Sequence, residues 1–372
     1  MKNNRSAIIP FFILAIFGLL MGLWAGLFRL GWIIPVFPKT LPSQHGPLMV
    51  SGFLGSLIAL ERVAALQRRW MFAAPLLSGV GWIISLATPG GWYGPLLITL
   101  GSLFALGILV VIVRRETKIY TLTMAVGVAC WLIGNLFWLF GAPIFEVVWI
   151  WAAFLVLTIT GERLELSRVL RFKPWHYQVF SLAAGIFLVG TFLHVWFPSV
   201  GSRIAGIGML ALAVWLMRFD IARRNLRHPA ALTRFIAVCL FSGYIWMGLS
   251  GVFNIVYGPQ FAGLRYDAEL HSVFIGFVFS MIFGHALIIL PALTGISVPF
   301  HKIFYAPLVL LHGSLLLRIT GDLFNWPEIR LWGGIINEVA ILGFLGVFVV
   351  SILQQRGKQA DPKQQFMAKK IP

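Results

Sequence analysis

Residues 45–66 read HGPLMVSGFLGSLIALERVAAL, an apolar stretch that begins with His45 and reaches its first acid only at Glu61. A helix of about 20 such residues crosses the roughly 30 Å of hydrocarbon in a bilayer. Because the bilayer core offers the backbone no water, helices are the default way to satisfy its N–H and C=O groups. The stretch therefore predicts a transmembrane helix with polar groups at both ends.

The rest of the chain follows the same pattern, which excludes a soluble globular protein. The 372 residues are 59% hydrophobic and only 11% charged, whereas globular chains carry about 25% charged residues. The abundance of Phe and Trp also excludes low-complexity disorder. The sequence predicts an all-α polytopic membrane protein with twelve transmembrane helices, at about 7–28, 45–66, 71–88, 93–113, 119–140, 144–161, 177–197, 202–221, 234–257, 266–291, 302–322 and 330–353.

The net charge of +17 is explained by membrane topology and does not call for a nucleic-acid partner. With the N-terminus inside, 23 of the 29 Lys and Arg residues fall on the inner side of the twelve helices. Basic residues collect on the cytoplasmic side of membrane proteins. We therefore expect a prokaryotic cytoplasmic (inner) membrane protein with both termini in the cytoplasm, no nucleic-acid partner, and a disordered basic tail at 354–372.

Three of the expected helices share a sequence register. The aligned segments are LIALERVAAL (57–66), TITGERLEL (158–166) and MIFGHALII (281–289). Two positions match in each helix, occupied by Glu61, Glu162 and His285 and, sixteen residues earlier, by His45, Glu146 and Glu269. This register predicts that the single transmembrane domain (1–353) comprises three parallel four-helix repeats about an axis along the membrane normal, at about 1–118, 119–228 and 229–353.

Two histidines are expected at similar depth, at the outer ends of the helices at 45–66 and 266–291. In the repeat register, His45 and His271 differ by about half a turn, roughly 3 Å at 1.5 Å per residue. Facing imidazoles on two helices suit bis-histidine ligation of haem, in which each supplies one axial nitrogen. The alternative is that both are ordinary helix-end histidines facing water or lipid headgroups.

Twelve helices in three units, with histidines at the outer ends of the second and tenth, resemble subunit I of haem-copper oxidases. The segment HGPLMVSGFLGSLIALER (45–62) is also similar in style to the early motif of NnrS proteins, a twelve-helix family linked to haem, copper and nitric-oxide stress. It lacks the GFLLTA-type stretch followed by Trp that NnrS proteins carry. The resemblance implies a low-spin b-type haem ligated by His45 and His271, and a redox or nitric-oxide-related function.

The resemblance does not extend to an oxygen-reducing copper centre. Glu269 stands where the oxidases carry the first histidine of a His-x-His pair, the helix at 144–161 has no histidine, and the helix at 177–197 has only His194 in its outer part. His194 and Glu269 would at most form a second, incomplete metal position, for copper. The resemblance therefore implies no complete haem-copper binuclear centre.

Arginines near the connection of the last two helices meet the haem propionates in the oxidases, and Arg318 and Arg330 occupy that region here. An equal alternative for Arg318 is an ion pair with Asp322, one turn along the same helix. Deeper in the last helix, Glu338 is expected to pair with His312 or Arg318, or to carry protons.

The acid–base pairs at the inner helix ends favour a structural ion-pair ring, with a functional intramembrane site as the alternative. The ring would comprise Glu61, Arg62, Glu162, Arg163 and His285.

Three functions remain open at this point. A protein with one bis-histidine haem has no free coordination position, so it would transfer electrons and not bind gas directly. The alternatives are a secondary transporter of a solute or ion that uses polar residues of the last two helices, and a cofactor-free membrane assembly subunit. The expected partners are the lipid bilayer and a redox partner or other membrane subunits.

Overall fold

The protein is an all-α multi-pass membrane protein. The computed structural model describes residues 5–88 and 90–360, and within them twelve helices are long and apolar enough to cross a membrane. They closely follow the predicted spans, because hydropathy sets which segments lipid can surround. The elements are α1 (Arg5–Leu30), η1 (Leu41–Gln44), α2 (His45–Pro47), η2 (Leu48–Gly55), α3 (Ser56–Leu66), η3 (Arg69–Phe72), α4 (Ala73–Ala87), α5 (Tyr93–Arg115), α6 (Ile119–Leu139), α7 (Ile144–Leu166), η4 (Ser167–Leu170), α8 (Pro174–Trp196), α9 (Pro198–Phe219), α10 (Ala222–Asn225), α11 (Ala231–Tyr257), α12 (Gly263–His271), η5 (Ser272–Phe279), α13 (Ser280–Thr294), η6 (Lys302–Phe304), α14 (Tyr305–Phe324) and α15 (Pro327–Ala360).

The last helix is longer than predicted. It continues as far as Ala360, so residues 354–360 of the expected disordered tail are helical. The rest of that tail, residues 361–372, lies outside the described residues.

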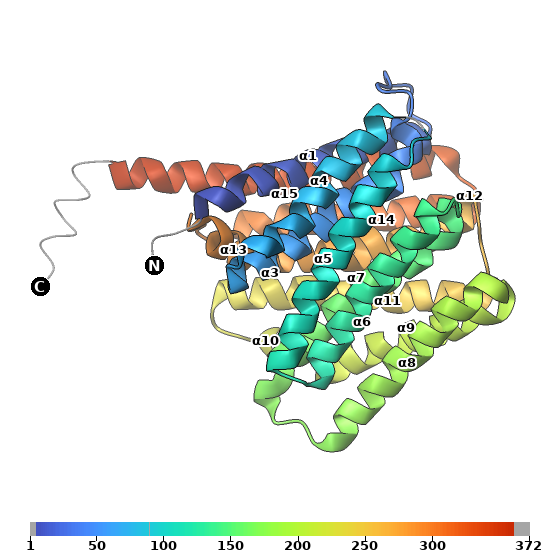
Figure 1. Cartoon of the computed structure of the whole chain (residues 1–372). Helices are drawn as coiled ribbons and strands as arrows, with labels where there is room; N and C mark the ends of the chain where they lie inside the picture. Colours follow the sequence, from blue (N-terminus) through green and yellow to red (C-terminus); the bar gives the residue numbers. More distant parts are fainter. Residues whose placement is uncertain (1–4, 89, 361–372) are drawn as a thin grey trace, which may run out of the picture.

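Helices that follow one another in the chain mostly pack side by side. The pairs α4–α5, α6–α7, α8–α9 and α14–α15 are extensively packed antiparallel hairpins, as their short connections require. Between the hairpins, α5 contacts α6 and α9 contacts α11, which joins them into one bundle (Figure 1).

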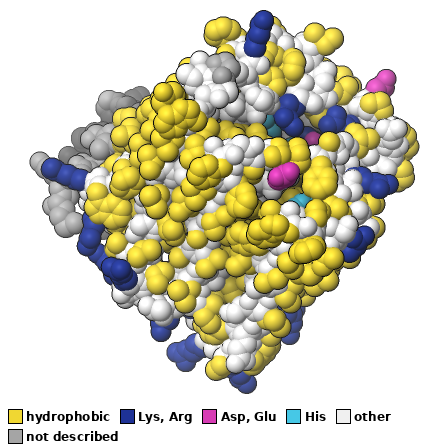
Figure 2. All heavy atoms as spheres, turned by 45° about the vertical axis from the view of Figure 1, so that its right-hand side comes forward, with side chains coloured by type: hydrophobic (Ala, Val, Ile, Leu, Met, Phe, Trp, Pro, Cys, Tyr) yellow, Lys and Arg dark blue, Asp and Glu magenta, His cyan; other side chains and the backbone are white. Residues whose placement is uncertain are grey.

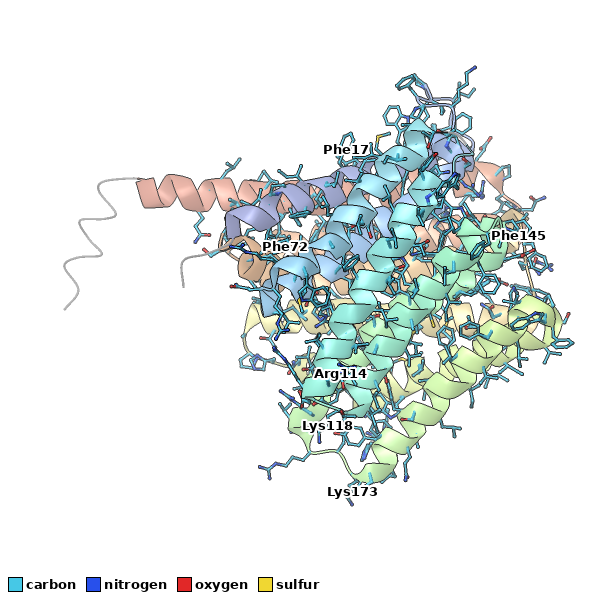
Figure 3. The ribbon with its side chains drawn as sticks, in the orientation of Figure 1. Phe17, Phe72, Arg114, Lys118, Phe145 and Lys173 are labelled. Carbon is cyan, nitrogen blue, oxygen red and sulfur yellow. The ribbon has the colours of Figure 1, made fainter. Side chains whose placement is uncertain are left out.

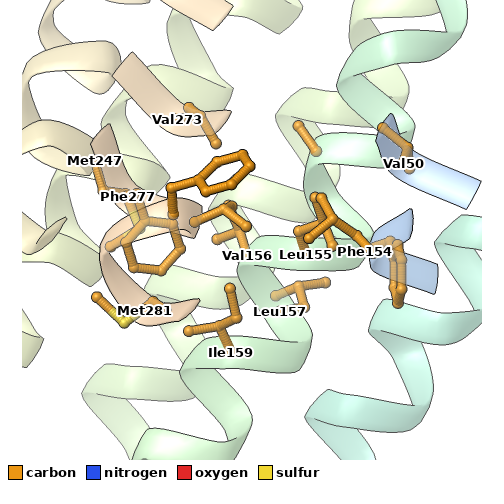
Figure 4. Close-up of a cluster of buried hydrophobic side chains, with 14 of the residues drawn as sticks. Val50, Phe154, Leu155, Val156, Leu157, Ile159, Met247, Val273, Phe277 and Met281 are labelled. Atoms are coloured by element: carbon orange, nitrogen blue, oxygen red, sulfur yellow. The ribbon is translucent and has the colours of Figure 1, made fainter. Parts of the chain in front are cut away.

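The centre of the bundle is α7, which has 83% of its most apolar window buried within the protein, the highest share among the described spans. Figure 4 shows its side chains Phe154, Leu155 and Ile159 among the buried cluster. Val50 of η2 lies on one side of this cluster, and Phe277 of η5 lies on the other (Figure 4). A helix surrounded by protein has no lipid face, which is why α7 is apolar all round.

The two ends of the bundle differ in charge. Arg114, Lys118 and Lys173 lie at one end, here called the basic end, and Phe145 lies at the opposite end (Figure 3). Between the ends, hydrophobic side chains cover most of the visible face, with many of the Lys and Arg side chains at its edges (Figure 2). This belt of apolar surface is what a bilayer requires of a spanning protein.

Two spans are interrupted by a π-helical segment of eight residues. Span 2 consists of α2, η2 and α3, and span 10 consists of α12, η5 and α13; both η2 and η5 are π-helical. Leu48 and Ser272, the first residues of these segments, lie 224 positions apart, the same offset that separates Glu61 from His285. The shared register supports the proposed repeat, which stays a prediction. Such π-helical turns are frequent at functional sites.

Candidate functional site

A cavity of about 660 Å³ lies between spans 2 and 10, α1, α7, α14 and α15, towards the end opposite the basic end. Its volume is within the range of small-molecule and cofactor sites. Four residues that the sequence singled out for haem binding line it together: His45, His271, Arg318 and Arg330. We call it the larger cavity.

The imidazole of His45 is held in one orientation by the backbone of α1. Its Nδ1 lies 2.8 Å from the carbonyl oxygen of Gly22. Because a carbonyl only accepts hydrogen bonds, Nδ1 carries the proton and Nε2 keeps its lone pair. Among the described residues, Nε2 has no hydrogen-bond partner. A Cβ at Gly26 would lie 3.1 Å from the imidazole carbon Cε1, so glycine lets the ring pack closely against α1 here.

The imidazole of His271 is held in the same tautomer. Its Nδ1 lies 2.8 Å from the carbonyl oxygen of Asp267, one turn earlier, and 3.2 Å from the Asp267 carboxylate. The Nε2 atom lies 3.3 Å from Nη2 of Arg318, whose N–H donates to it. Both histidines therefore have Nδ1 engaged by protein and an unprotonated Nε2.

Asp267 links the polar groups of the larger cavity. Its carboxylate accepts two hydrogen bonds of 2.8 Å from the guanidinium of Arg318, and Arg330 lies 3.7 Å away. Arg330 in turn donates to Asp322 at 2.8 Å. The alternative of an ion pair between Arg318 and Asp322 is therefore not observed, because the Arg318 guanidinium binds Asp267 and Asp322 pairs with Arg330.

Of the two predicted roles of Glu338, the pairing with His312 or Arg318 is not observed, and the proton-carrying role stays a prediction. Glu338 lines the larger cavity and forms an ion pair with neither His312 nor Arg318 among the described residues. Its Oε1 would lie 3.5 Å from a Cβ at Gly26, the same point that the His45 ring approaches. His312 instead accepts a hydrogen bond from the Trp246 indole at 2.9 Å. Glu338 is thus a carboxylate beside His45.

The second metal position remains a prediction. His194 Nε2 and both carboxylate oxygens of Glu269 are buried without hydrogen-bond partners. Within residues 5–88 and 90–360, no three His, Cys, Asp or Glu side chains gather in a group that could hold a metal ion.

A second cavity, the smaller cavity, measures about 120 Å³ and lies nearer the basic end. Glu61, Glu162 and His285 all line it, from α3, α7 and α13. The three residues that align in the sequence register therefore lie around one cavity, although their helices are distant in the chain.

The charges around the smaller cavity pair between helices. Arg62 contacts Glu162 on α7. Arg163 donates two hydrogen bonds of 2.9 Å to Asp220, and the side chains of this pair are only 4% and 0% exposed. The Nε2 atom of His285 lies 3.4 Å from Arg163. The expected ion-pair ring is formed only in part: Glu61 joins no ion pair among the described residues, and Asp220, which was not predicted, pairs with Arg163.

Sequence reasoning missed both aspartates that organise these networks. Asp267 stands four residues before His271 and Asp220 stands at the end of an apolar helix. Acids are scarce in this chain, with 12 Asp and Glu against 29 Lys and Arg. An acid inside or beside a span was therefore the signal that could have found them.

Residues 8–353 match a protein family described as a domain of unknown function (DUF8744). The chain belongs to the DUF8744 family. The matched region contains both cavities of this DUF8744 protein and each of their lining residues. No curated protein gives a significant match to the chain.

Proposed function

We propose that this DUF8744 protein binds a b-type haem in the larger cavity, with His45 and His271 as axial ligands, and transfers electrons within a membrane. The observation that carries the proposal is that the two histidines have the same tautomer and the same kind of hydrogen bond. They come from different spans, line one cavity, and each has its Nδ1 bonded to a backbone carbonyl. Histidines that ligate metals are oriented in this way, with the second ring nitrogen left to bind the metal.

The surroundings of the two histidines suit a macrocycle with an apolar body and acidic edges. Val50, Leu54, Phe274 and Phe279 are among the apolar side chains that line the larger cavity. Apolar walls of this kind exclude water from a bound ring and set its dielectric environment.

The basic residues of the larger cavity suit the two propionates of a haem. Arg318, Arg330 and Arg29 all line it. Arg318 is engaged by Asp267, whereas Arg29 forms no ion pair with any described residue. Arginine binds carboxylates strongly where water is excluded. Arg29 would hold one propionate directly, Arg330 would share its guanidinium between the other propionate and Asp322, and Arg318 would leave Nε2 of His271 when that atom binds iron.

Two histidine ligands leave no open position on iron, which favours electron transfer over gas binding. The protein's own contribution is to fix both imidazoles, exclude water and supply positive charge. By the distribution of basic residues, the larger cavity would face the outer side of a prokaryotic cytoplasmic membrane. A redox partner would dock on the connections at that end.

The test is a visible absorption spectrum of the protein, purified from cells with ample haem and recorded oxidised and dithionite-reduced. We expect a sharp reduced α band that is lost in both His45→Ala and His271→Ala. The matched control is Glu146→Ala, which changes the residue at the register position of His45 on α7 and should keep the band. Gel filtration checks that each variant is folded. A protein that stays colourless after haem addition would falsify the proposal.

A further inference from the structure

The two cavities share part of their walls. Leu54, Phe279 and Ile341 line both the larger and the smaller cavity. All three side chains are buried, and the Phe279 ring stacks on Phe53 at a centroid distance of 6.1 Å. The cavities therefore adjoin, with apolar side chains of spans 2 and 10 and of α15 at the boundary. We call Leu54, Phe279 and Ile341 the apolar gate.

Acids lie on both sides of the apolar gate. Glu338 lines the larger cavity and Glu61 lines the smaller one, and neither forms an ion pair within the described part of the chain. The sixteen residues from His45 to Glu61 correspond to about 24 Å of helix. Together the cavities therefore extend over most of the roughly 30 Å of membrane hydrocarbon.

We propose that the two cavities form a path for protons across the membrane, closed at the apolar gate. The path does not depend on haem binding. Glu61, with Glu162 and His285 beside it, exchanges protons at the basic end, and Glu338 exchanges them in the larger cavity. Each transfer moves a proton from one oxygen or nitrogen to the next through intervening water.

The size and lining of the smaller cavity favour protons over other ions. A volume of about 120 Å³ accommodates several water molecules, since one water needs roughly 10–15 Å³. A metal ion would have to give up its hydration shell at Leu54, Phe279 and Ile341, which offer it no oxygen ligand. Protons pass along a short water file without that loss, and apolar constrictions gate such files by excluding water.

The backbone beneath the apolar gate is π-helical in both spans. Leu54 lies in η2 and Phe279 in η5, within the last two residues of each π-helical segment. A change between π-helical and α-helical hydrogen bonding turns the side chains of such a segment about the helix axis. A local shift in this hydrogen bonding would re-aim Leu54 and Phe279 and so open the boundary between the cavities.

The experiment uses the full-length protein in liposomes that contain a pH-sensitive dye. Valinomycin and a potassium gradient drive proton entry, and the change in internal pH is recorded. Leu54→Ala should raise proton influx about tenfold, which corresponds to roughly 1.4 kcal/mol of barrier. The matched control is Leu316→Ala, at a side chain of α14 that is 60% exposed on the lipid-facing surface; its influx should equal that of the unmodified protein.

The role of Glu61 is tested in the Leu54→Ala protein, in which the path is open. Adding Glu61→Gln to Leu54→Ala should return the influx close to the unmodified level, whereas Glu328→Gln, at an exposed residue at the start of α15, should not. If Leu54→Ala does not fold, Ile341→Ala takes its place.

If proton influx through the Leu54→Ala protein equals that through the Leu316→Ala control, the proposed path is overturned. Influx that is carried by sodium or potassium overturns its assignment to protons. The haem band is recorded on the same preparation, so failure of the proton path and failure of haem binding are separate results.

Discussion

Spans 2 and 10 change to π-helical hydrogen bonding for eight residues, whereas α7, which follows the same register, is α-helical from Ile144 to Leu166. The position occupied by Gly52 in span 2 and Gly276 in span 10 is Ala153 in α7. The two glycines face the indoles of Trp82 and Trp246. The interrupted spans supply the histidines of the larger cavity, and the regular helix supplies the packed centre of the bundle.

This difference shows that helices with the same sequence register can either line a cavity, as spans 2 and 10 do, or form the packed centre of the bundle, as α7 does. A π-helical turn leaves backbone groups out of the regular ladder and re-aims side chains, which a ligand site can use. A regular helix with an apolar surface all round is best suited to be covered by protein. The comparison predicts different responses of the two kinds of span to substitution.

The largest effect is expected where α7 carries a buried charge. Asp220→Asn leaves the Arg163 guanidinium buried without its carboxylate, which should lower the free energy of unfolding by about 3–5 kcal/mol. Denaturant unfolding in detergent micelles measures this loss. The control is Glu116→Gln, at a pair with Arg168 whose side chains are 45% and 54% exposed; its loss should be about 0–1 kcal/mol. Equal losses would contradict the assigned burial.

A smaller effect is expected at the glycine of span 10. A Cβ at Gly276 would lie 2.5 Å from Cβ and Cγ of Trp246, so Gly276→Ala should cost about 1–3 kcal/mol through overpacking. Gly52→Ala should cost less, since the nearest indole atom of Trp82 lies 3.0 Å away. Gly313→Ala serves as the control, because nothing lies within 4 Å of its Cβ. Thermal unfolding that ranks the three differently would break the comparison.

The smallest effect is expected for one hydrogen bond to the π-helical segment of span 2. The Trp131 indole donates to the Ser51 hydroxyl at 2.9 Å, and both side chains are buried. Ser51→Ala should cost about 1 kcal/mol because the indole N–H loses its partner. Ser242→Ala removes a hydroxyl that bonds only carbonyls of its own helix, so the same unfolding measurement should show a smaller loss. A Ser51→Ala protein as stable as the control would contradict this role.

The spans and the gathering of Glu61, Glu162 and His285 in one cavity follow from local sequence. Hydropathy identifies a helix without knowledge of its neighbours, and one register fixes depth in the membrane. The ion-pair partners of the charged side chains do not follow from local sequence. Arg318 has Asp322 one turn away along its own helix, yet it pairs with Asp267 on another span.

The π-helical segments could not be predicted either. Their hydrogen bonding depends on how spans 2 and 10 pack against their neighbours, and glycine clusters alone do not specify it. Glu338 shows the same limit, since its approach to His45 depends on the close packing of α1 at Gly26. The depth of these charged groups and histidines in the membrane could therefore be predicted from the sequence, whereas their interaction partners depend on tertiary packing.

The burial of α7 has a consequence for biosynthesis. This helix contacts η5, which is made more than one hundred residues later. While the chain is being inserted, the surface of α7 that η5 will cover must therefore face lipid or a chaperone. A chain that stopped after α11 would keep that surface uncovered, so an unfinished copy differs from a finished one in the apolar surface that its central helix exposes.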